Sequence, residues 1–129
     1  MTRDVTGETK WESPMQEAED LRRAGKYDRA IVVAKKALDL VEKTLGRDHP
    51  DVVKSLDNLA LLYKTQGQYT QAVPLYVRSL VILVKALGPD HPHVCASLEN
   101  MAELYRATNR PKEADALDRR AAKIRAKKR

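Results

Sequence analysis

The sequence predicts an all-α protein, an α-solenoid in which about six helices form three stacked helix-turn-helix repeats. The composition favours helices, because only 5% of the 129 residues are aromatic, glycine occurs five times, and Ala, Leu, Lys, Arg and Glu dominate. One stretch of sequence recurs further along the chain, and apolar residues follow helical spacing within each copy. These observations predict helical repeats that share one core.

The internal repeat is clearest between residues 45–63 (LGRDHPDVVKSLDNLALLY) and 87–105 (LGPDHPHVCASLENMAELY), an offset of 87 − 45 = 42 residues. The positions that are identical in both copies are Leu45, Gly46, Asp48, His49, Pro50, Val52, Ser55, Leu56, Asn58, Ala60, Leu62 and Tyr63. A weaker upstream copy places Gly25, Tyr27, Ala30 and Leu38 at the same offset before Gly67, Tyr69, Ala72 and Leu80. We therefore expect three repeats, of which the first is truncated and the last degenerates after Tyr105.

The first helix is expected to begin at Ser13, because Ser13-Pro14-Met15-Gln16 fits the S-x-x-Q capping box. Residues 1–12 are predicted to be a flexible N-terminal segment. A repeat domain is predicted over residues 13–127, with repeats at about 13–44, 50–86 and 92–127. The second helix of each repeat should begin near residues 27, 69 and 111, because Pro111 replaces Tyr69 in register and proline suits a first helical turn.

Two apolar stripes define the middle repeat. Val52, Leu56, Leu59, Ala60 and Tyr63 share one helical face, and a second stripe runs from Ala72 to Leu83. Gly67 ends the first helix, and Gly46 and Gly88 stand where a helix C-terminus needs a positive φ. Pro74 lies inside the second helix, which is expected to bend slightly and to continue past it.

The motifs SLDNLALLY, SLENMAELY, LGPDHPHV and QGQYTQAVPLY resemble the tetratricopeptide repeat, specifically the 42-residue variant of kinesin light chains. The resemblance implies a right-handed superhelix with a concave groove that binds proteins. Its large apolar positions are matched by Leu56, Leu59 and Tyr63 and again by Leu98, Met101 and Tyr105, and its small position in the second helix by Ala30, Ala72 and Ala114. Pro14 and Glu17 depart from the pattern in the first repeat, and Asp118 replaces the equivalent of Tyr76 in the last, as expected for terminal repeats.

The stretch DHPHVC, residues 90–95, offers four side chains that can bind a metal, Asp90, His91, His93 and Cys95. The earlier copy DHPDVV keeps the Asp, His and Pro but has Asp51 and Val53 in place of His93 and Cys95. We therefore predict an inter-repeat turn with no metal, in which Asp48 or Asp90 caps the next helix, Pro50 or Pro92 starts it, and His49 or His91 bonds locally. A metal site remains the alternative.

A groove is predicted on the side of each first helix opposite its core positions. The groove residues are Lys54, Asp57, Asn58, Leu61, Lys64 and Thr65 in the middle repeat, and Ala96, Glu99, Asn100, Glu103, Arg106 and Ala107 in the last. First-repeat candidates are Met15, Gln16, Glu19 and Arg23. Asn58 and Asn100 are expected to bind the backbone of a peptide, since an amide both donates and accepts; the alternative is a solvated or structural amide.

The net charge of +6 comes from residues 119–129, which hold seven basic residues and no acid. This segment could bind nucleic acid or an anionic surface, but Leu117, Ala121 and Ile124 continue an apolar stripe that predicts a capping helix. Nucleic acid is therefore not the expected partner.

The predicted function is a non-catalytic scaffold that binds a peptide segment or partner helix in the groove. Motifs for phosphate loops, nucleophiles and zinc proteases are absent from the sequence, so neither an enzyme nor a cofactor is expected. One cysteine, no signal sequence and no run of about 18 apolar residues predict a cytoplasmic protein without a membrane span. Self-association through the apolar ends of the stack or Trp11 is a further possibility.

Overall fold

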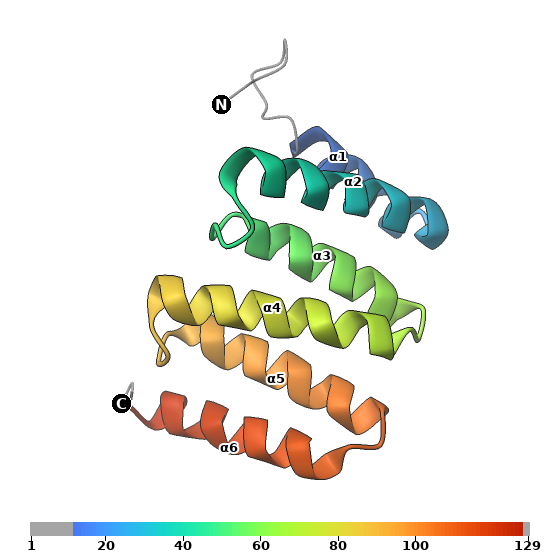
Figure 1. Ribbon diagram of the computed structural model, residues 1–129. Helices are drawn as coiled ribbons and strands as arrows, with labels where there is room; N and C mark the ends of the chain where they lie inside the picture. Colours follow the sequence, from blue (N-terminus) through green and yellow to red (C-terminus); the bar gives the residue numbers. More distant parts are fainter. Residues whose placement is uncertain (1–11, 128–129) are drawn as a thin grey trace.

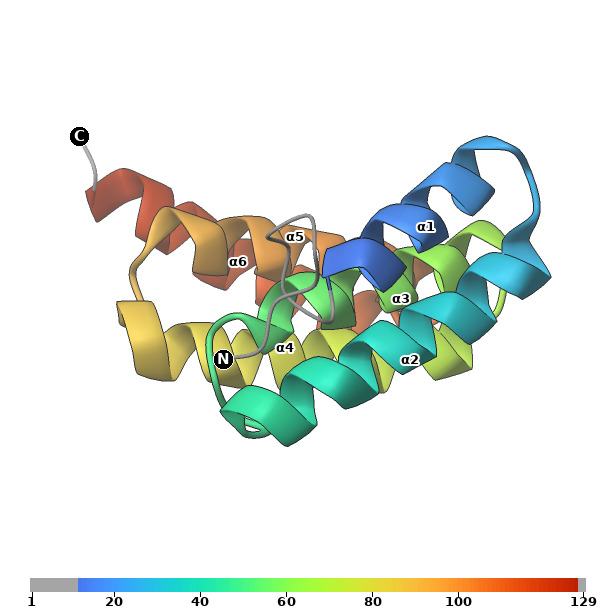
Figure 2. The same ribbon diagram turned by 90° about the horizontal axis from the view of Figure 1, so that it is seen from above.

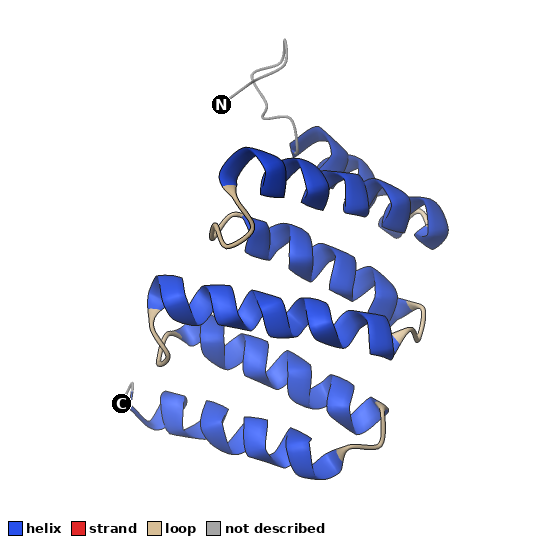
Figure 3. Ribbon diagram, viewed as in Figure 1, coloured by secondary structure: helices blue, strands red, loops and turns tan. Residues whose placement is uncertain are grey.

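The computed structural model describes residues 12–127, which form six helices joined by short turns. The helices are α1 (Glu12–Arg23), α2 (Tyr27–Leu45), α3 (Val52–Thr65), α4 (Tyr69–Leu87), α5 (Pro92–Ala107) and α6 (Pro111–Lys127). No strand occurs in this described part of the chain (Figure 3). The predicted all-α repeat fold is therefore confirmed. Trp11 and the flexible segment predicted over residues 1–12 lie outside the described residues, except for the backbone of Glu12.

The helices form three hairpins, α1/α2, α3/α4 and α5/α6, stacked one on the next (Figure 1). Each helix packs mainly on its neighbours in sequence, and α1 also touches α3. The view down the stack shows that successive hairpins are rotated relative to one another (Figure 2). In the view of Figure 1, α1, α3 and α5 lie behind α2, α4 and α6, so the first helices share one side of the molecule.

The core runs through the whole stack without a break. One buried cluster joins α1 to α4 through Ala18, Ile31, Leu56 and Ile82, and two others join α3 and α4 to α5 and α6. Val53 packs against two of these clusters and so connects them. No hairpin can bury its apolar face alone, and stacking supplies the missing partner surface.

The second helix of each repeat begins where the sequence predicts, at Tyr27, Tyr69 and Pro111. Helix α4 continues through Pro74, as expected. Helix α1 begins at Glu12, one residue before the predicted start at Ser13, which is within the usual ambiguity of a helix end.

Gly46 and Gly88 follow α2 and α4 with φ of 99° and 93° and ψ near 155°. This region of backbone conformation is almost closed to residues with a Cβ. Each glycine donates its N–H to the carbonyl four residues earlier, Glu42 or Val84. The predicted positive φ is therefore confirmed at both inter-repeat turns.

The inter-repeat turns are capped by histidine. His91 Nδ1 accepts a hydrogen bond of 3.1 Å from the His93 N–H at the start of α5, and His49 Nδ1 accepts one of the same length from the Asp51 N–H before α3. The predicted local role of both histidines is confirmed. The prediction that aspartate caps α5 was wrong, because Asp90 instead pairs with Lys127 of α6 at 3.0 Å.

Proline begins only one of the two helices that follow these turns. Pro92 is the first residue of α5, as predicted, whereas α3 begins at Val52, two residues after Pro50. The turn before α3 therefore includes Pro50 and Asp51. The shared Asp-His-Pro sequence sets the turn but allows the helix start to shift.

Within the described residues, α4 is the one helix long and apolar enough to cross a membrane, with a mean hydropathy of 1.3 over its most apolar 18 residues. It lies in the middle of the stack, packed on α3 and α5, and buries Ala72, Tyr76, Ile82 and Leu83. A helix that packs between two neighbours needs apolar residues on several sides. The packing of α4 therefore accounts for much of its apolar composition. Val77 and Val81 remain exposed on its outer surface.

Candidate functional site

The predicted groove residues occupy the sides of α3 and α5 that face away from the core. Leu56, Leu59 and Ala60 of α3 are buried, as are Leu98, Met101 and Ala102 at the equivalent positions of α5. Every predicted groove residue is at least partly accessible: Lys54, Thr65, Ala96, Asn100, Glu103, Arg106 and Ala107 are exposed, and Asp57, Asn58, Leu61, Lys64 and Glu99 are half-buried. We call this surface the α3–α5 face.

Most charges on the α3–α5 face are compensated within the protein. Lys64 of α3 pairs with Glu103 of α5 at 3.0 Å and so bridges the two helices. Glu99 pairs with Arg125 of α6, and Arg106 pairs with Asp118 of the same helix. Exposed ion pairs of this kind add little stability, but they reduce the charge that the face offers to a ligand.

The two asparagines lie in different surroundings. Asn58 is half-buried and lines a narrow crevice with Ala18, Glu19, Arg22 and Leu62, between α1 and α3. Asn100 is exposed and lines a wider pocket between α3, α4 and α5. Neither amide makes a side-chain hydrogen bond to another residue in the described part of the chain. Both amides can therefore bond to water or to a ligand.

The pocket between α3, α4 and α5 has a volume of about 230 Å³. Its lining residues are Val53, Asp57, Tyr76, Leu83, His93, Ala96, Ser97 and Asn100. The volume is below the roughly 300–1,000 Å³ of most small-molecule sites and above the roughly 150 Å³ of a cavity that admits benzene. This space suits one long side chain better than a cofactor.

Asp57 is an acid of the pocket whose pKa is shifted by its surroundings. Burial raises the pKa of its carboxyl above the ordinary value of 3.8, and the nearby Ser79 hydroxyl offsets part of that rise. Neither Asp57 Oδ1 nor Ser79 Oγ has a partner at hydrogen-bond distance, so the offset is weak. Asp57 is thus a half-buried carboxylate without a cationic partner in the described structure.

Tyr76 stands on the α4 side of the same pocket and is 5% exposed. Burial, followed by the negative charges of Asp57 and Glu103, raises the pKa of its phenol to about 12. Tyr76 therefore stays neutral over the physiological range. It offers the pocket an aromatic surface and a hydroxyl, with no charge.

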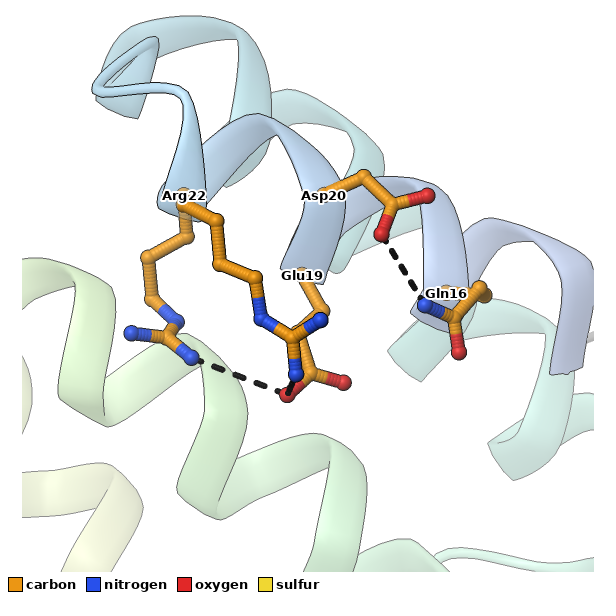
Figure 4. A network of polar contacts seen from close by, with 5 residues as sticks. Gln16, Glu19, Asp20 and Arg22 are labelled. Atoms are coloured by element: carbon orange, nitrogen blue, oxygen red, sulfur yellow. Dashed lines mark hydrogen bonds and ion pairs between the residues drawn. The ribbon is translucent and has the colours of Figure 1, made fainter.

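The groove residues predicted in the first repeat make ion pairs and hydrogen bonds within the protein. Glu19 pairs with Arg22 at 3.6 Å and with Arg23 at 3.2 Å, and Gln16 Nε2 donates to Asp20 Oδ1 at 3.0 Å (Figure 4). Met15 Sδ accepts from the Ser55 hydroxyl of α3 at 3.3 Å. These side chains hold α1 together and join it to α3.

The side chains of DHPHVC separate into different environments. His91 Nδ1 caps α5, Asp90 pairs with Lys127, and Cys95 is 5% exposed with its thiol donating to the Ala121 carbonyl at 3.4 Å. Among the described residues, no three Asp, Glu, His or Cys side chains converge as a metal site would need. His93, in contrast, reaches the pocket that contains Asp57.

Helix α6 packs on α5 through the predicted apolar stripe. Ala114, Ala121 and Ile124 are buried and Leu117 is half-buried. Arg125 pairs with Glu99 of α5, and Lys127 pairs with Asp90 in the turn before α5. The capping role predicted for this helix thus uses two of its cations as well as its apolar side.

The pocket also contains residues that the wheel analysis did not select. Val53, Tyr76, Leu83 and Ser97 line it but sit at core positions or on the second helix. A wheel treats each helix alone, so it cannot show a space formed by three helices. The sequence does contain one sign of the pocket. Position 83 is leucine, whereas its repeat equivalent, position 125, is arginine, so the two repeats differ at a residue that lines it.

Solved structures with this fold are kinesin-light-chain-like repeats and other tetratricopeptide domains. A crystal structure of nearly identical TPR-like repeats from Podosopora anserina, described as those of a kinesin light chain, is 29% identical, with a TM-score of 0.78. The match covers 91% of this chain and 56% of that one, so the chain spans about half the length of that relative.

Two further structures share the fold at lower identity. BtubC (BKLC) from P. vanneervenii is 24% identical over 88% of this chain and 45% of its own, with a TM-score of 0.81. The TPR domain of Arabidopsis FLU is 18% identical over 90% of this chain and 95% of its own, with a TM-score of 0.74. Comparison with curated proteins found no match.

The family model for the tetratricopeptide repeat matches residues 13–80 and again residues 56–127, which together span nearly all of the described chain. Repeats of this family generally mediate protein–protein interactions. The sequence motifs, the three stacked hairpins and these matches agree, and the chain therefore belongs to the tetratricopeptide repeat family.

Proposed function

We propose that the chain is a non-catalytic interaction module that binds an extended peptide segment or a partner helix along the α3–α5 face. Solenoids of this kind use the concave surface of the stack for binding. The observation that carries the proposal is the availability of Asn58 and Asn100, whose amides have no bond to another residue in the described structure. Such amides can donate to and accept from a peptide backbone.

The charge pattern supports a ligand held by hydrogen bonds and side-chain pockets. Lys64, Glu99, Glu103 and Arg106 are already paired within the protein. A clamp for a peptide carboxylate needs several unpaired cations, and on the α3 and α5 positions of this face Lys54 is the one cation without an acidic partner in the described structure. We therefore propose a ligand that is recognised along its backbone, without a terminal carboxylate as its anchor.

The test is the affinity of Asn58→Ala with Asn100→Ala for a partner recovered by affinity pulldown and mass spectrometry from the native cell. We expect Kd to rise at least tenfold, because each lost backbone bond costs about 1 kcal/mol. Far-UV circular dichroism and the melting temperature should stay nearly unchanged. The matched control is Asn109→Gly, which removes an exposed amide in the turn before α6, away from this face, at a φ of 63° that glycine adopts without strain. Unaltered affinity of the double variant would move the binding site elsewhere.

Binding of nucleic acid by the basic end of α6 is the second candidate. Arg119, Arg120 and Lys123 are exposed, whereas Arg125 and Lys127 are paired with acids. Counterion release would make such binding weaken steeply with salt. A titration of generic DNA or RNA that shows no loss of affinity between low and physiological ionic strength would reject this candidate.

A further inference from the structure

The pocket between α3, α4 and α5 combines an apolar lining with buried acceptors. Val53, Leu83 and Tyr76 supply the apolar surface, and Asp57, Ser97 and Asn100 supply polar groups. Lysine and arginine side chains have the same division, a long apolar stem and a charged head that donates several hydrogen bonds. The lining is therefore complementary to a basic side chain in both of its parts.

Two acceptors of the pocket have no partner. Asp57 Oδ1 and Ser97 Oγ are buried and make no hydrogen bond in the described structure, and Ser97 is only 7% exposed. A buried polar group without a partner costs about 1–3 kcal/mol, and more if it is charged. Both atoms are closed to solvent, so a donor that enters the pocket recovers part of this cost when the Asp57 and Ser97 side chains turn toward it, which gives the site an energetic reason to bind one.

The internal repeat shows which chemistry satisfies an acid at this position. Asp57 of α3 is equivalent to Glu99 of α5, and Glu99 is paired with Arg125 of α6. The residue equivalent to Arg125 in the middle repeat is Leu83 (125 − 42 = 83), which lines the pocket. The middle repeat thus keeps the acid and lacks the internal base.

We propose that this pocket binds one lysine or arginine side chain of a partner protein, with Asp57 as the ion-pair acceptor and Ser97 as a second acceptor. The partner's basic group takes the role toward Asp57 that Arg125 takes toward Glu99. Lys64 and Arg106 do not fill that role, because Glu103 and Asp118 hold them. The inference rests on the proposed function, since the partner segment must lie over the α3–α5 face to reach the pocket.

The test is an NMR titration of the ¹⁵N-labelled full chain with Nα-acetyl-arginine methylamide. The matched control ligand is Nα-acetyl-citrulline methylamide, which has nearly the same shape but no charge. We expect saturable shifts of the backbone amides of Asp57, Ala96, Ser97 and Asn100 with a millimolar Kd. Citrulline should bind at least fivefold more weakly, because it lacks the ion pair with Asp57. Equal binding of the two ligands would overturn the proposal.

Two protein variants complete the test. Asp57→Asn should abolish the arginine-specific shifts, whereas Glu99→Gln, the repeat-equivalent change at an acid already paired with Arg125, should leave them unchanged. Ala96→Arg, at an exposed position in the pocket lining, should block the probe by supplying the basic group from within the chain. Unchanged binding to both Asp57→Asn and Ala96→Arg would contradict the assignment.

The outcome separates this inference from the proposed function. If Asn58→Ala with Asn100→Ala weakens partner binding and Asp57→Asn does not, the α3–α5 face binds the partner and the basic-side-chain pocket is rejected. If the arginine probe binds but the asparagine variant retains full affinity for the partner, the pocket stands and the proposed peptide site fails. Light scattering across a concentration series tests whether a second copy of the chain supplies the basic side chain. If dimers form as the concentration rises and Asp57→Asn abolishes them, the partner is a second copy of this chain and not a different protein.

Discussion

Asp57 has a cost for folding that its repeat equivalent avoids. Glu99 is paired with Arg125, whereas Asp57 is half-buried with one oxygen unpartnered, and burial raises the pKa of its carboxyl. A group with a raised acid pKa binds more protons in the folded than in the unfolded state. Its contribution to stability therefore falls as pH rises from the ordinary pKa of 3.8 through the raised value.

Asp57→Asn should accordingly raise the free energy of unfolding at neutral pH, by about 1 kcal/mol or roughly 4 °C in melting temperature. The gain should shrink as pH is lowered and disappear below 3.8, where the wild-type carboxyl is protonated in both states. Thermal unfolding at a series of pH values measures it, and Glu99→Gln is the matched control that should not stabilise. A destabilised Asp57→Asn protein would mean that the carboxylate has a structural partner.

A variant that gains stability and loses binding is typical of functional sites, where the residues that bind a ligand are not those that stabilise the fold best.

The accessibility of Asp57 and Asn100 could be predicted from a helical wheel of one repeat. The pocket itself could not, because Ser97 and Leu83 sit on core-facing positions and line it only through the packing of three helices. Nor could a wheel show that Lys64, Glu99 and Arg106 are paired, because their partners lie on other helices.

At the level of helices, the start of α5 depends on the side chain of His91. Its Nδ1 accepts the His93 N–H, one of the four N-terminal donors that a helix leaves without an internal partner. Sequence reasoning expected Asp90 in this role, because aspartate is the commoner cap. It could not foresee that Lys127, 37 residues away, would pair with Asp90.

His91→Ala should lower the free energy of unfolding by about 1 kcal/mol, the usual cost of a lost N-cap. His93→Ala is the control, because it removes the same contact between the two rings but keeps the cap. Its effect should stay within about 0.5 kcal/mol in chemical denaturation. Equal losses for the two variants would assign the stability to the ring contact.

The turns between helices differ in how strictly they need glycine. Gly67, between α3 and α4, has φ of 75°, and its equivalent before α6 is Asn109 with φ of 63°. Asparagine tolerates this left-handed region. Gly88 combines φ of 93° with ψ of 156°, a region nearly restricted to glycine.

Gly88→Asn should therefore destabilise the protein by about 1–3 kcal/mol, and Gly67→Asn by less than about 0.5 kcal/mol. No atom lies within 4 Å of a Cβ built at either glycine, so a steric clash does not explain the difference. Urea unfolding of both variants measures it. Similar losses in the two variants would show that backbone conformation is not the controlling factor.

Across the whole molecule, the repeat made the fold predictable. The 42-residue offset fixed the number of hairpins, and the positions of Tyr27, Tyr69 and Pro111 fixed the starts of the second helices. Helix starts after the DHP turns were less predictable, since Pro92 begins α5 and Pro50 lies before α3. The two turns share Gly, Asp, His and Pro but differ at Arg47 against Pro89 and at Asp51 against His93, so the shared residues alone do not set the helix start.

The stack presents two candidate surfaces to a partner. The α3–α5 face holds the free asparagine amides and the Asp57 pocket, and the outer surface of α2 and α4 holds the exposed valines Val32, Val77 and Val81. We propose that binding takes place on the first surface.

Hydrogen–deuterium exchange of the full chain, with and without the partner recovered by pulldown, tests this assignment most directly. We expect added protection at residues 54–65 of α3 and 96–107 of α5, and little change in α2. Protection confined to α2 and α4, or to the basic end of α6, would contradict it.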